Sequence, residues 1–341
     1  MFQLNMLKIG ILGAGAMGEE HSRCYNTLFK GKTDKNVCPT EISLYGICDY
    51  RKEVATKLAN KFNIKKVYTN PHKLIDEVNM VDICLPTKLH PKFTIEAAQK
   101  GKHILCEKPI ALNLKDAEQM ILAAKKTKVK FMIAQVVRFW PEYVTLKNII
   151  DSGELGELIF ITMSRDIALP VWSDKNWLLD NSQSGGVVTD LHIHDIDFTN
   201  FLIGKPVSVY STGIKANNGL HTQVSTTLKY PGKLAYVESN FLMPKGYELG
   251  NYVKAVCKNG FIEINNKAKH TLTVQKPGKK YTYPKLPEKD GYISEIEYFI
   301  NCILKDKEPK IVTPEDAKFA LELVLKAKES LETNKEVRWR S

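Results

Sequence analysis

The sequence predicts an α/β fold with two domains, and three observations support this prediction. Its 341 residues exceed what one small core needs, and chains of this length commonly form about two domains. Over residues 1–135, short apolar runs alternate with amphipathic segments, which predicts a doubly wound parallel sheet with helices on both faces. From Leu158 onward, strand-like alternation dominates. We place a second α/β domain at residues 136–312, followed by a helix and strand at 313–341 that pack back toward the first domain.

The elements of the first domain follow from local patterns. Five short apolar runs predict strands at residues 8–12, 42–48, 80–85, 103–106 and 130–134. Apolar residues three and four positions apart predict helices at residues 52–62, 91–100 and 114–126. Residues 1–6 are expected to be a short leader, because they have neither the features of a signal peptide nor the length of a membrane span.

The second domain is predicted to be rich in strands. Short runs separated by Gly, Pro, Asn or Lys turns predict strands at residues 207–215, 224–230, 234–241, 253–257 and 261–264. The last helix has a clear start, because Thr313 is a suitable N-cap, Pro314 suits the first helical position and acidic residues follow.

Charge and cysteine content exclude several classes of protein. Residues 1–135 contain 22 basic and 13 acidic residues, a difference of +9, and the remainder contains 27 and 25, a difference of +2. No basic block or nucleic-acid-binding motif occurs, so we expect neither a nucleic-acid nor a membrane partner; the excess suits a phosphate-bearing small ligand or a solvated surface. The seven cysteines form no CxxC pair, which favours free thiols in a reducing cytoplasm.

A glycine-rich turn follows the first predicted strand. The sequence GAGAMG at residues 13–18 is a G-x-G-x-x-G motif at a strand-to-helix junction. Gly13 permits the tight turn, Gly15 lets the backbone approach a pyrophosphate, and Gly18 lets helix and strand pack closely. The backbone N–H groups at the helix start, near Ala16 and Met17, would face the phosphates. This predicts a dinucleotide site.

The second predicted strand ends at a candidate for nucleotide selectivity. Asp49 stands where a carboxylate can accept hydrogen bonds from the adenosine ribose, which favours NAD. It lies 31 residues after Gly18 against about 20 in the usual fingerprint, and a polar insertion at residues 30–41 can account for the excess. Arg51 could instead pair with a 2′-phosphate, so NADP stays open.

The segment SGGVVTDLHIHDIDFTNFLIG, residues 184–204, contains two histidines and three aspartates close together. As one helix from Gly185, it would place Asp190, His194 and Asp197 on a single face. His192 would point about 200° away from Asp190, since each residue advances about 100°. The two histidines therefore cannot share one ion in a helix, and we predict no metal site.

Other motifs extend along nearly the whole chain. They are Pro86-Thr87 followed by His90, GKHILCEKP at residues 101–109, Arg138-Phe139-Trp140-Pro141, IDSGELGEL at 150–158, Trp177, Gly185-Gly186 with Asp190 and His194, and VTPEDAKFALELVLKAKES at 312–330. Together they resemble the Gfo/Idh/MocA family of glucose-fructose oxidoreductase, inositol 2-dehydrogenase and rhizopine-catabolism proteins. Glu107-Lys108-Pro109, followed at distance by Asp190-x-x-x-His194, is the most specific part.

The resemblance implies a Rossmann domain and a C-terminal α/β domain with an open, mostly antiparallel sheet, which often carries the oligomer contact. It implies an NAD(P)-dependent dehydrogenase that transfers a hydride between nicotinamide and a secondary hydroxyl of a sugar or cyclic polyol. We expect NAD as cofactor, with NADP possible, a homo-oligomer, dimer or tetramer, and a cytoplasmic location.

The resemblance also implies roles for individual residues. His194 would be the acid/base, because imidazole suits proton transfer near neutral pH, and Asp190 would bind a substrate hydroxyl or orient the imidazole. Lys108 would stabilise negative charge on the reacting oxygen and contact both substrate and cofactor. The remaining residues are implied to contact the cofactor or line the substrate mouth: Pro86, Thr87, His90, Glu107 and Arg138 for the cofactor, and Arg138 and Trp177 for the mouth.

Two positions depart from the family pattern. Leu178 follows Trp177 where many members have arginine, and His192 replaces a common glycine, as in the inositol dehydrogenase branch. The second departure favours a cyclic polyol or sugar. Alternatives are a cofactor-sensing regulator without turnover, an NAD-dependent glycosidase of the same family, and a metal-dependent hydrolase built on His192 and His194.

Overall fold

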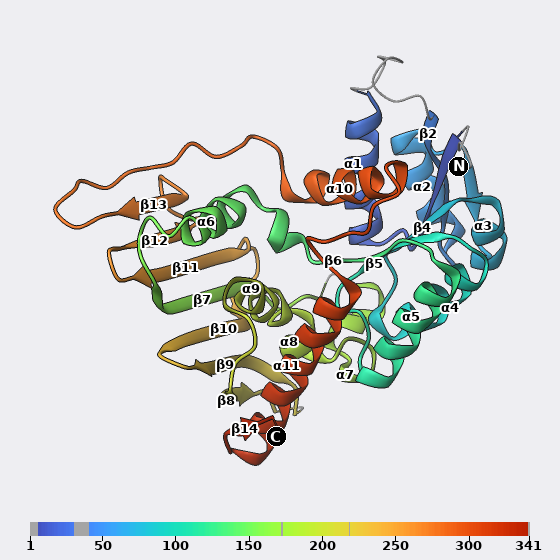
Figure 1. Cartoon of the computed structure of the whole chain (residues 1–341). Helices are drawn as coiled ribbons and strands as arrows, with labels where there is room; N and C mark the ends of the chain where they lie inside the picture. Colours follow the sequence, from blue (N-terminus) through green and yellow to red (C-terminus); the bar gives the residue numbers. More distant parts are fainter. Residues whose placement is uncertain (1–5, 31–40, 172, 218, 340–341) are drawn as a thin grey trace. The chain divides into compact units, whose positions relative to one another are not determined.

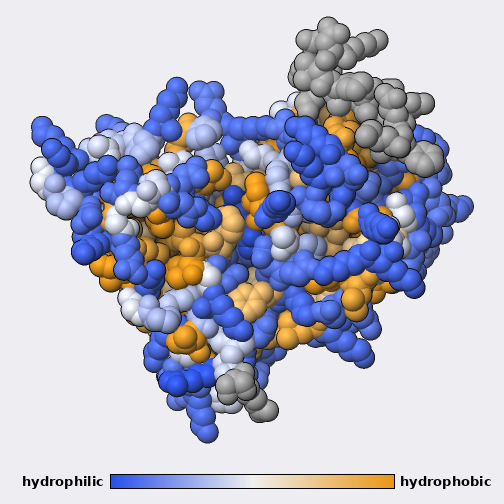
Figure 2. Space-filling model, in the orientation of Figure 1, coloured by the Kyte–Doolittle hydropathy of each residue, from blue (hydrophilic) through white to orange (hydrophobic). Residues whose placement is uncertain are grey.

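The chain forms two compact units, each described here by itself. The computed structural model describes residues 6–30, 41–171, 173–217 and 219–339. Residues 1–5 of the predicted leader and most of the polar insertion lie outside the described residues, whereas Met6 begins the first strand. The first unit comprises Met1–Val136 and Asp290–Lys318, and the second comprises Val137–Lys289 and Phe319–Ser341. Within the described part, no helix combines the length and apolar character needed to cross a membrane. Hydrophilic residues prevail on the face drawn in Figure 2.

The first unit contains a six-stranded parallel sheet (Figure 1). Its strands are β1 (Met6–Leu12), β2 (Glu41–Cys48), β3 (Lys66–Tyr68), β4 (Met80–Ile83), β5 (His103–Glu107) and β6 (Phe131–Ala134). Their order is β3-β2-β1-β4-β5-β6, and every neighbouring pair is parallel. From β1, the chain adds β2 and β3 on one side and β4 to β6 on the other, so the order of the strands reverses between β1 and β4. Open α/β sheets bind ligands at such a position. The predicted parallel sheet is confirmed.

Helices connect these strands at nearly the predicted positions. They are α1 (Ala16–Lys30), α2 (Lys52–Phe62), α3 (Pro71–Glu77), η1 (Thr87–Leu89), α4 (His90–Gln99) and α5 (Leu114–Thr127). Side-chain capping and backbone conformation set the two ends of α5. The Asn113 side chain caps its start by accepting the Asp116 N–H at 2.9 Å, and Lys128 ends it in a left-handed conformation. The sequence analysis missed β3 and α3, because elements of three and seven residues are too short to show periodicity.

One segment groups with a different unit from the one that the sequence suggested. The helix α10 (Gly291–Leu304) lies within residues 136–312, yet it belongs to the first unit and packs on α1. Asp290 caps this helix by accepting the Ile293 N–H at 3.1 Å and forms an ion pair with Arg23 of α1 at 2.5 Å. Buried Ile296 and Phe299 form its apolar stripe. The sequence analysis predicted no helix here, and an apolar stripe indicates a buried face without identifying its partner.

The second unit contains an eight-stranded, mostly antiparallel sheet. Its strands are β7 (Leu158–Ala168), β8 (Ser208–Lys215), β9 (His221–Tyr230), β10 (Lys233–Met243), β11 (Gly250–Cys257), β12 (Gly260–Asn265), β13 (Leu272–Gln275) and β14 (Val337–Arg338). The order is β13-β12-β11-β7-β10-β9-β8-β14. Among the described strands of this second sheet, only the β7–β10 pair is parallel. This architecture confirms the predicted fold class.

Helices of the second unit are η2 (Val136–Phe139), α6 (Pro141–Asp151), η3 (Asp174–Leu179), α7 (Asn181–Ser184), α8 (Gly186–Asp190), α9 (Ile193–Ile203) and α11 (Pro314–Thr333). Helices α8 and α9 pack on β7, β9 and β10, and side chains facing this layer are buried, as Ile161 and Val237 show. The division between units falls inside α11, after Lys318, and β14 pairs with β8. The C-terminal strand therefore extends the second sheet, whereas the sequence suggested packing toward the first domain.

Candidate functional site

The glycine-rich turn lies at the carboxyl end of β1. The structure gives a different reason for glycine at each of its three glycine positions. Gly13 has a φ of +102°, and a Cβ there would collide with the Cys84 carbonyl oxygen. A Cβ on Gly18 would collide with the Gly13 carbonyl oxygen. A Cβ on Gly15, by contrast, would meet nothing within 4 Å. The protein's own packing requires Gly13 and Gly18, and the open space over Gly15 fits a pyrophosphate lying against the backbone.

Substitution of Gly15 should separate binding from folding. We expect Gly15→Ala to keep its melting temperature but to raise the NADH dissociation constant about tenfold or more, because the methyl group occupies the pyrophosphate's space. The control Gly18→Ala should instead lose about 2 kcal/mol or more of stability through the collision. Calorimetric titration with NADH and thermal unfolding measure both; unchanged NADH affinity in Gly15→Ala would contradict this assignment.

Asp49 follows β2 and is held toward the glycine-rich turn. Its Oδ2 accepts the Ala14 N–H at 2.9 Å, and its Oδ1 accepts the Arg51 N–H at 2.9 Å and the Arg51 side chain at 3.0 Å. Burial alone would raise the pKa of Asp49, but the hydrogen bonds from Arg51 and Ala14 hold it below its ordinary value. Asp49 therefore stays ionised at neutral pH.

A neutral side chain at this position should weaken the preference for NAD. We expect Asp49→Asn to bind NADH about tenfold more weakly, because a charged acceptor of ribose hydrogen bonds is lost. The NADPH affinity should change less or improve, since repulsion of the 2′-phosphate is removed and Arg51 is released from its pair. Fluorescence titration with both cofactors checks this, and Lys61→Met, which removes an exposed charge on α2, is the control. Equal losses for both cofactors would refute a selective role.

Lys108 lies on a turn at the carboxyl end of β5 that is fixed on both sides. Of residues 104–111, Lys108 is the one side chain that is not buried. Its backbone N–H donates to Glu107 Oε2 at 3.1 Å. The carbonyl oxygen of Pro109 lies 2.8 Å from His90 Nδ1, and His90 Nε2 lies 2.8 Å from the Leu85 carbonyl oxygen. The fold thus exposes one ammonium group on a braced turn.

The residues predicted to contact the cofactor after β4 and β5 include Thr87, His90 and Glu107, which are buried. His90 and Thr87 are each 1% exposed, and burial lowers the pKa of His90. Because both His90 nitrogens lie at backbone carbonyls, the structure favours a brace for the turn over a direct cofactor contact. Pro86 is partly exposed beside them. Glu107 is 6% exposed and lies beside the Lys108 amide rather than projecting into solvent.

In the second unit, the single helix that the sequence analysis began at Gly185 is wrong. Helix α8 ends at Asp190, and α9 begins at Ile193. The His192 N–H bonds to the Val187 carbonyl five residues back, at 2.9 Å, which inserts one extra residue into the turn. This wider turn lets the His192 side chain contact two strands of the sheet. Its Nδ1 lies 2.9 Å from Ser239 Oγ of β10, and its Nε2 lies 2.8 Å from Thr226 Oγ1 of β9.

The separation of the two histidines nevertheless agrees with the sequence argument. His192 is fully buried, and burial lowers its pKa to about 3. Asp190 and His194 are the only side chains of residues 186–199 that are not buried. Groups of described residues that could hold a metal ion include neither His192 nor His194. The segment therefore presents one acid and one imidazole at its surface.

The other acids of this segment form buried ion pairs. Asp197 binds Arg138 through two contacts of 2.8 and 2.6 Å, and both side chains are about 1% exposed. Asp195 binds Arg165 through contacts of 2.9 and 2.8 Å. Asp197 and Arg138 therefore anchor α9 within the second unit, a role that the sequence analysis did not foresee. Arg165 was missed altogether, since nothing in a strand pattern marks a buried arginine.

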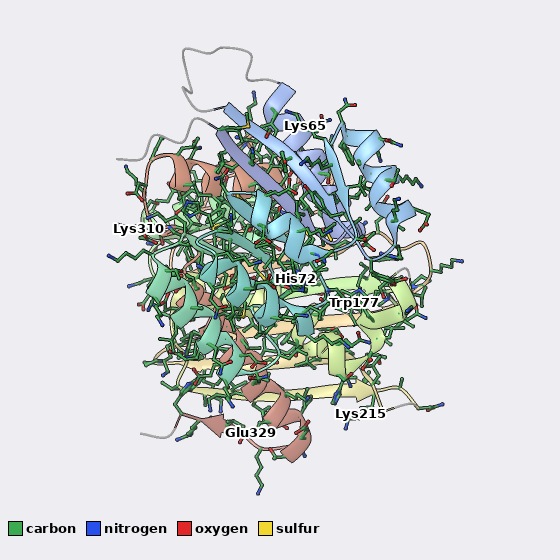
Figure 3. All side chains as sticks on the ribbon, turned by 90° about the vertical axis from the view of Figure 1, so that its right-hand side faces the viewer. Lys65, His72, Trp177, Lys215, Lys310 and Glu329 are labelled. Atoms are coloured by element: carbon green, nitrogen blue, oxygen red, sulfur yellow. The ribbon has the colours of Figure 1, made fainter. Side chains whose placement is uncertain are left out.

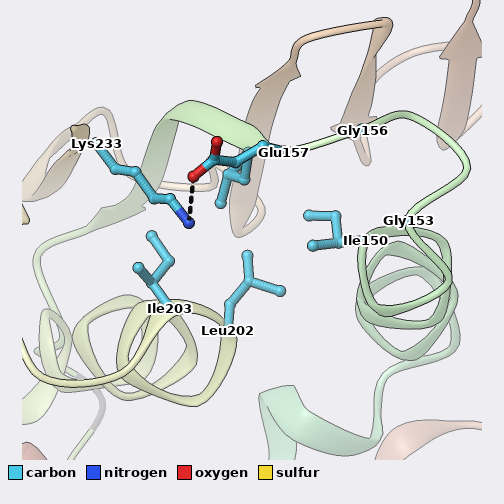
Figure 4. Close-up of a pocket in the computed structure, with 8 residues that line it drawn as sticks. Ile150, Gly153, Gly156, Glu157, Leu202, Ile203 and Lys233 are labelled. Carbon is cyan, nitrogen blue, oxygen red and sulfur yellow. Dashed lines mark ion pairs between the residues drawn. The ribbon is translucent and has the colours of Figure 1, made fainter. Parts of the chain in front are cut away.

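Trp177 is partly exposed on η3, where Figure 3 labels it, and Leu178 beside it is buried. The backbone is strained here, because Lys175 and Asn176 both have positive φ angles, of 51° and 53°. A separate pocket of about 430 Å³ opens in the second unit between α6, α9 and the start of β7 (Figure 4). Apolar Ile150, Leu202 and Ile203 line it. It contains none of the predicted site residues.

The parallel sheet order, the glycine-rich turn that leaves space over Gly15, and the ionised Asp49 define a dinucleotide-binding oxidoreductase fold. Comparison with known proteins agrees. Residues 7–135 match the oxidoreductase family with NAD-binding Rossmann fold, and residues 143–263 match the GFO/IDH/MocA C-terminal domain. The chain belongs to the Gfo/Idh/MocA family. It is an NAD-dependent oxidoreductase of the class that acts on CH–OH groups.

Relatives and solved structures match the chain over its full length. It is 29% identical to myo-inositol 2-dehydrogenase of Thermotoga maritima, over 97% of this chain and 98% of that protein. It is 28% identical to scyllo-inositol 2-dehydrogenase (NAD(+)) of Bacillus subtilis, over 96% and 94%. The structure of levoglucosan dehydrogenase with NADH and levoglucosan has a TM-score of 0.87 and 22% identity, over 98% and 100%, which shows a shared fold.

Proposed function

We propose that the chain transfers a hydride between NAD and a secondary ring hydroxyl of a cyclic polyol or sugar, with an inositol as the leading substrate class. Full-length similarity to two proteins named inositol 2-dehydrogenases supports the substrate class. The observation that carries the assignment is the selective exposure of three polar side chains. Lys108, Asp190 and His194 are partly exposed within segments whose other residues are buried. Side chains that served only to pack the interior would be buried like their neighbours.

Each residue has a chemical role in this proposal. When bound, NAD accepts the hydride from the substrate carbon. His194 takes the hydroxyl proton, Lys108 stabilises the negative charge that develops on the oxygen, and Asp190 binds a neighbouring hydroxyl or orients the imidazole. The oxidation balances as alcohol plus NAD⁺ giving ketone, NADH and one proton. Trp177 forms part of the substrate mouth in the same proposal.

The cofactor contacts are proposed from the first unit. Gly13, Gly15, Ala16, Met17 and Gly18 approach the pyrophosphate. Asp49 takes the ribose, while Pro86 and Thr87 lie toward the nicotinamide half. His90 and Glu107 act through the Lys108 turn. We further propose a homo-oligomer in the cytoplasm, where the described cysteines would stay free thiols.

A substrate panel tests the proposed function. Purified protein with NAD⁺ should form NADH with one or more of myo-inositol, scyllo-inositol and pyranose sugars. Formation of free sugar from a glycoside without net NADH would favour the glycosidase of the same family. NADH binding without turnover on any member of the panel would favour a cofactor-sensing regulator, and either result would reject the dehydrogenase.

A further inference from the structure

A buried cluster of ionisable groups lies behind the Lys108 turn. His21, on the second turn of α1, places Nδ1 at 2.9 Å from Asp82 Oδ2 of β4. Its Nε2 lies 3.1 Å from Glu107 Oε1 of β5, close enough for an ion pair although not aligned as a hydrogen bond. His21 and Asp82 are fully buried, and Glu107 nearly so. This places one imidazole between two carboxylates inside the first unit.

The geometry favours a charged imidazole over a neutral one. A neutral ring offers one N–H donor and one lone pair, whereas an ionised carboxylate only accepts. With acidic oxygens beside both nitrogens, a neutral ring would set a lone pair against one of them. Burial works against the charge, but the charge and hydrogen bond of Asp82, with a contribution from Cys84, raise the pKa of His21 well above 6.5.

The other groups around His21 support this charge distribution. The Tyr25 hydroxyl donates to Asp82 Oδ2 at 2.8 Å, and Cys84 Sγ lies 3.5 Å from His21 Nδ1. Burial raises the pKa of Tyr25 and of Cys84, so both remain protonated. Helix α10 adds Tyr292, whose ring centroid is 6.4 Å from that of His21, and the buried carboxyl of Glu295 one turn further along. His21 therefore provides the positive charge that lies between the Asp82 and Glu107 carboxyl groups.

The cluster continues to the backbone of Lys108. Glu107 places one carboxylate oxygen beside His21, and its other oxygen, Oε2, accepts the Lys108 N–H at 3.1 Å. A buried carboxylate without a partner would rotate or attract water. The imidazolium removes that tendency, because it holds the orientation of the Glu107 side chain. His21, on helix α1, thereby holds the turn that carries the Lys108 ammonium group.

We propose that His21 is a positioning residue for Lys108: held by Asp82, its imidazolium fixes the Glu107 carboxylate, which holds the Lys108 backbone in place. This inference rests on the proposed function of Lys108. A loosened turn lets the ammonium group move relative to the reacting oxygen, and small misplacements of a catalytic group lower the rate strongly. His21 itself touches neither substrate nor cofactor in this arrangement.

A metal ion is the competing occupant of the cluster. The ligand atoms of His21, Asp82 and Cys84 lie within 4.8 Å of one another. A transition metal would need an unprotonated Nδ1 and a thiolate. Nδ1 instead lies at hydrogen-bond distance from Asp82, and burial keeps the thiol protonated. The geometry therefore favours a proton over a metal.

Variants of the cluster test the proposal in the full-length protein. We expect His21→Gln, which keeps a similar size without the charge, to lower kcat about 10- to 100-fold while the NADH dissociation constant changes little. Glu107→Gln should do the same, and the double variant should be no worse than the poorer single variant, because both act through one contact. The matched control is Tyr25→Phe, which removes the other partner of Asp82 and should leave kcat unchanged.

Two measurements are independent of turnover. The backbone amide resonance of Lys108 should shift in His21→Gln but not in Tyr25→Phe. Because the folded-state pKa of His21 is raised, its contribution to stability is fully present below 6.5 and is lost as the pH rises through the folded value. The stability difference between the wild type and His21→Gln should therefore shrink at alkaline pH.

Several results would overturn the inference. They are wild-type kcat in folded His21→Gln, an unmoved Lys108 amide, additive losses in the double variant, or a stoichiometric transition metal whose removal abolishes activity. These outcomes differ from failure of the proposed function, in which the wild type would oxidise no substrate while the Lys108 amide still responded to His21→Gln.

Discussion

Replacement of Lys108 by methionine should lower kcat for polyol oxidation about 10²- to 10³-fold while the protein remains folded. Methionine keeps the length and apolar stem of lysine but removes the ammonium group, which the braced turn presents as its one side chain that is not buried. Loss of a charge that acts on the reacting oxygen in the transition state affects kcat more than substrate binding.

The control for this experiment is Lys57→Met, which removes an exposed charge from α2 and should leave kcat unchanged. Steady-state kinetics and circular dichroism of both variants provide the comparison. A Lys108→Met enzyme with wild-type kcat would exclude Lys108 from the reaction and, with it, the role assigned to the turn.

The two neighbouring histidines should respond in opposite ways. His194→Asn should lower kcat about 10²- to 10⁴-fold, because the proton acceptor is lost, and should leave stability nearly intact. His192→Asn should retain most of its activity per folded molecule but lose about 2–4 kcal/mol of stability. Its substitution opens a buried cavity and leaves the Ser239 and Thr226 hydroxyls without the ring nitrogens.

Urea unfolding and kinetics of both variants measure this contrast. If His194→Asn lost stability and His192→Asn lost activity, the roles assigned to the two histidines would be contradicted.

Much of the fold could be predicted from the sequence, because the signals were local. Apolar runs such as residues 42–48 and 103–106 identify strands of the parallel sheet, and the glycine-rich turn marks the end of the first strand. The family resemblance was confirmed by two domain matches. The position of α10 could not be predicted, because an apolar stripe indicates a buried face without identifying its partner.

The candidate site was less accessible to sequence reasoning. A helical wheel separated His192 from His194, but the actual separation depends on a wide turn that lets His192 bond to two strands. The family resemblance implied Arg138 as a site residue, and helical spacing placed Asp197 on the face of His194, yet the two form a buried pair. His21 and Asp82 are 61 residues apart, so only the fold brings them together.

Direct isotope transfer tests the central claim, that this chain moves a hydride between a ring carbon and NAD. The enzyme is incubated with NAD⁺ and an inositol or sugar deuterated at the reacting carbon, and the cofactor and sugar products are analysed by mass spectrometry. We predict one deuterium in the nicotinamide ring of NADH and an equal amount of ketone, with both lost in Lys108→Met and His194→Asn. Product formation without deuterated NADH, or equal transfer by those variants, would contradict the account.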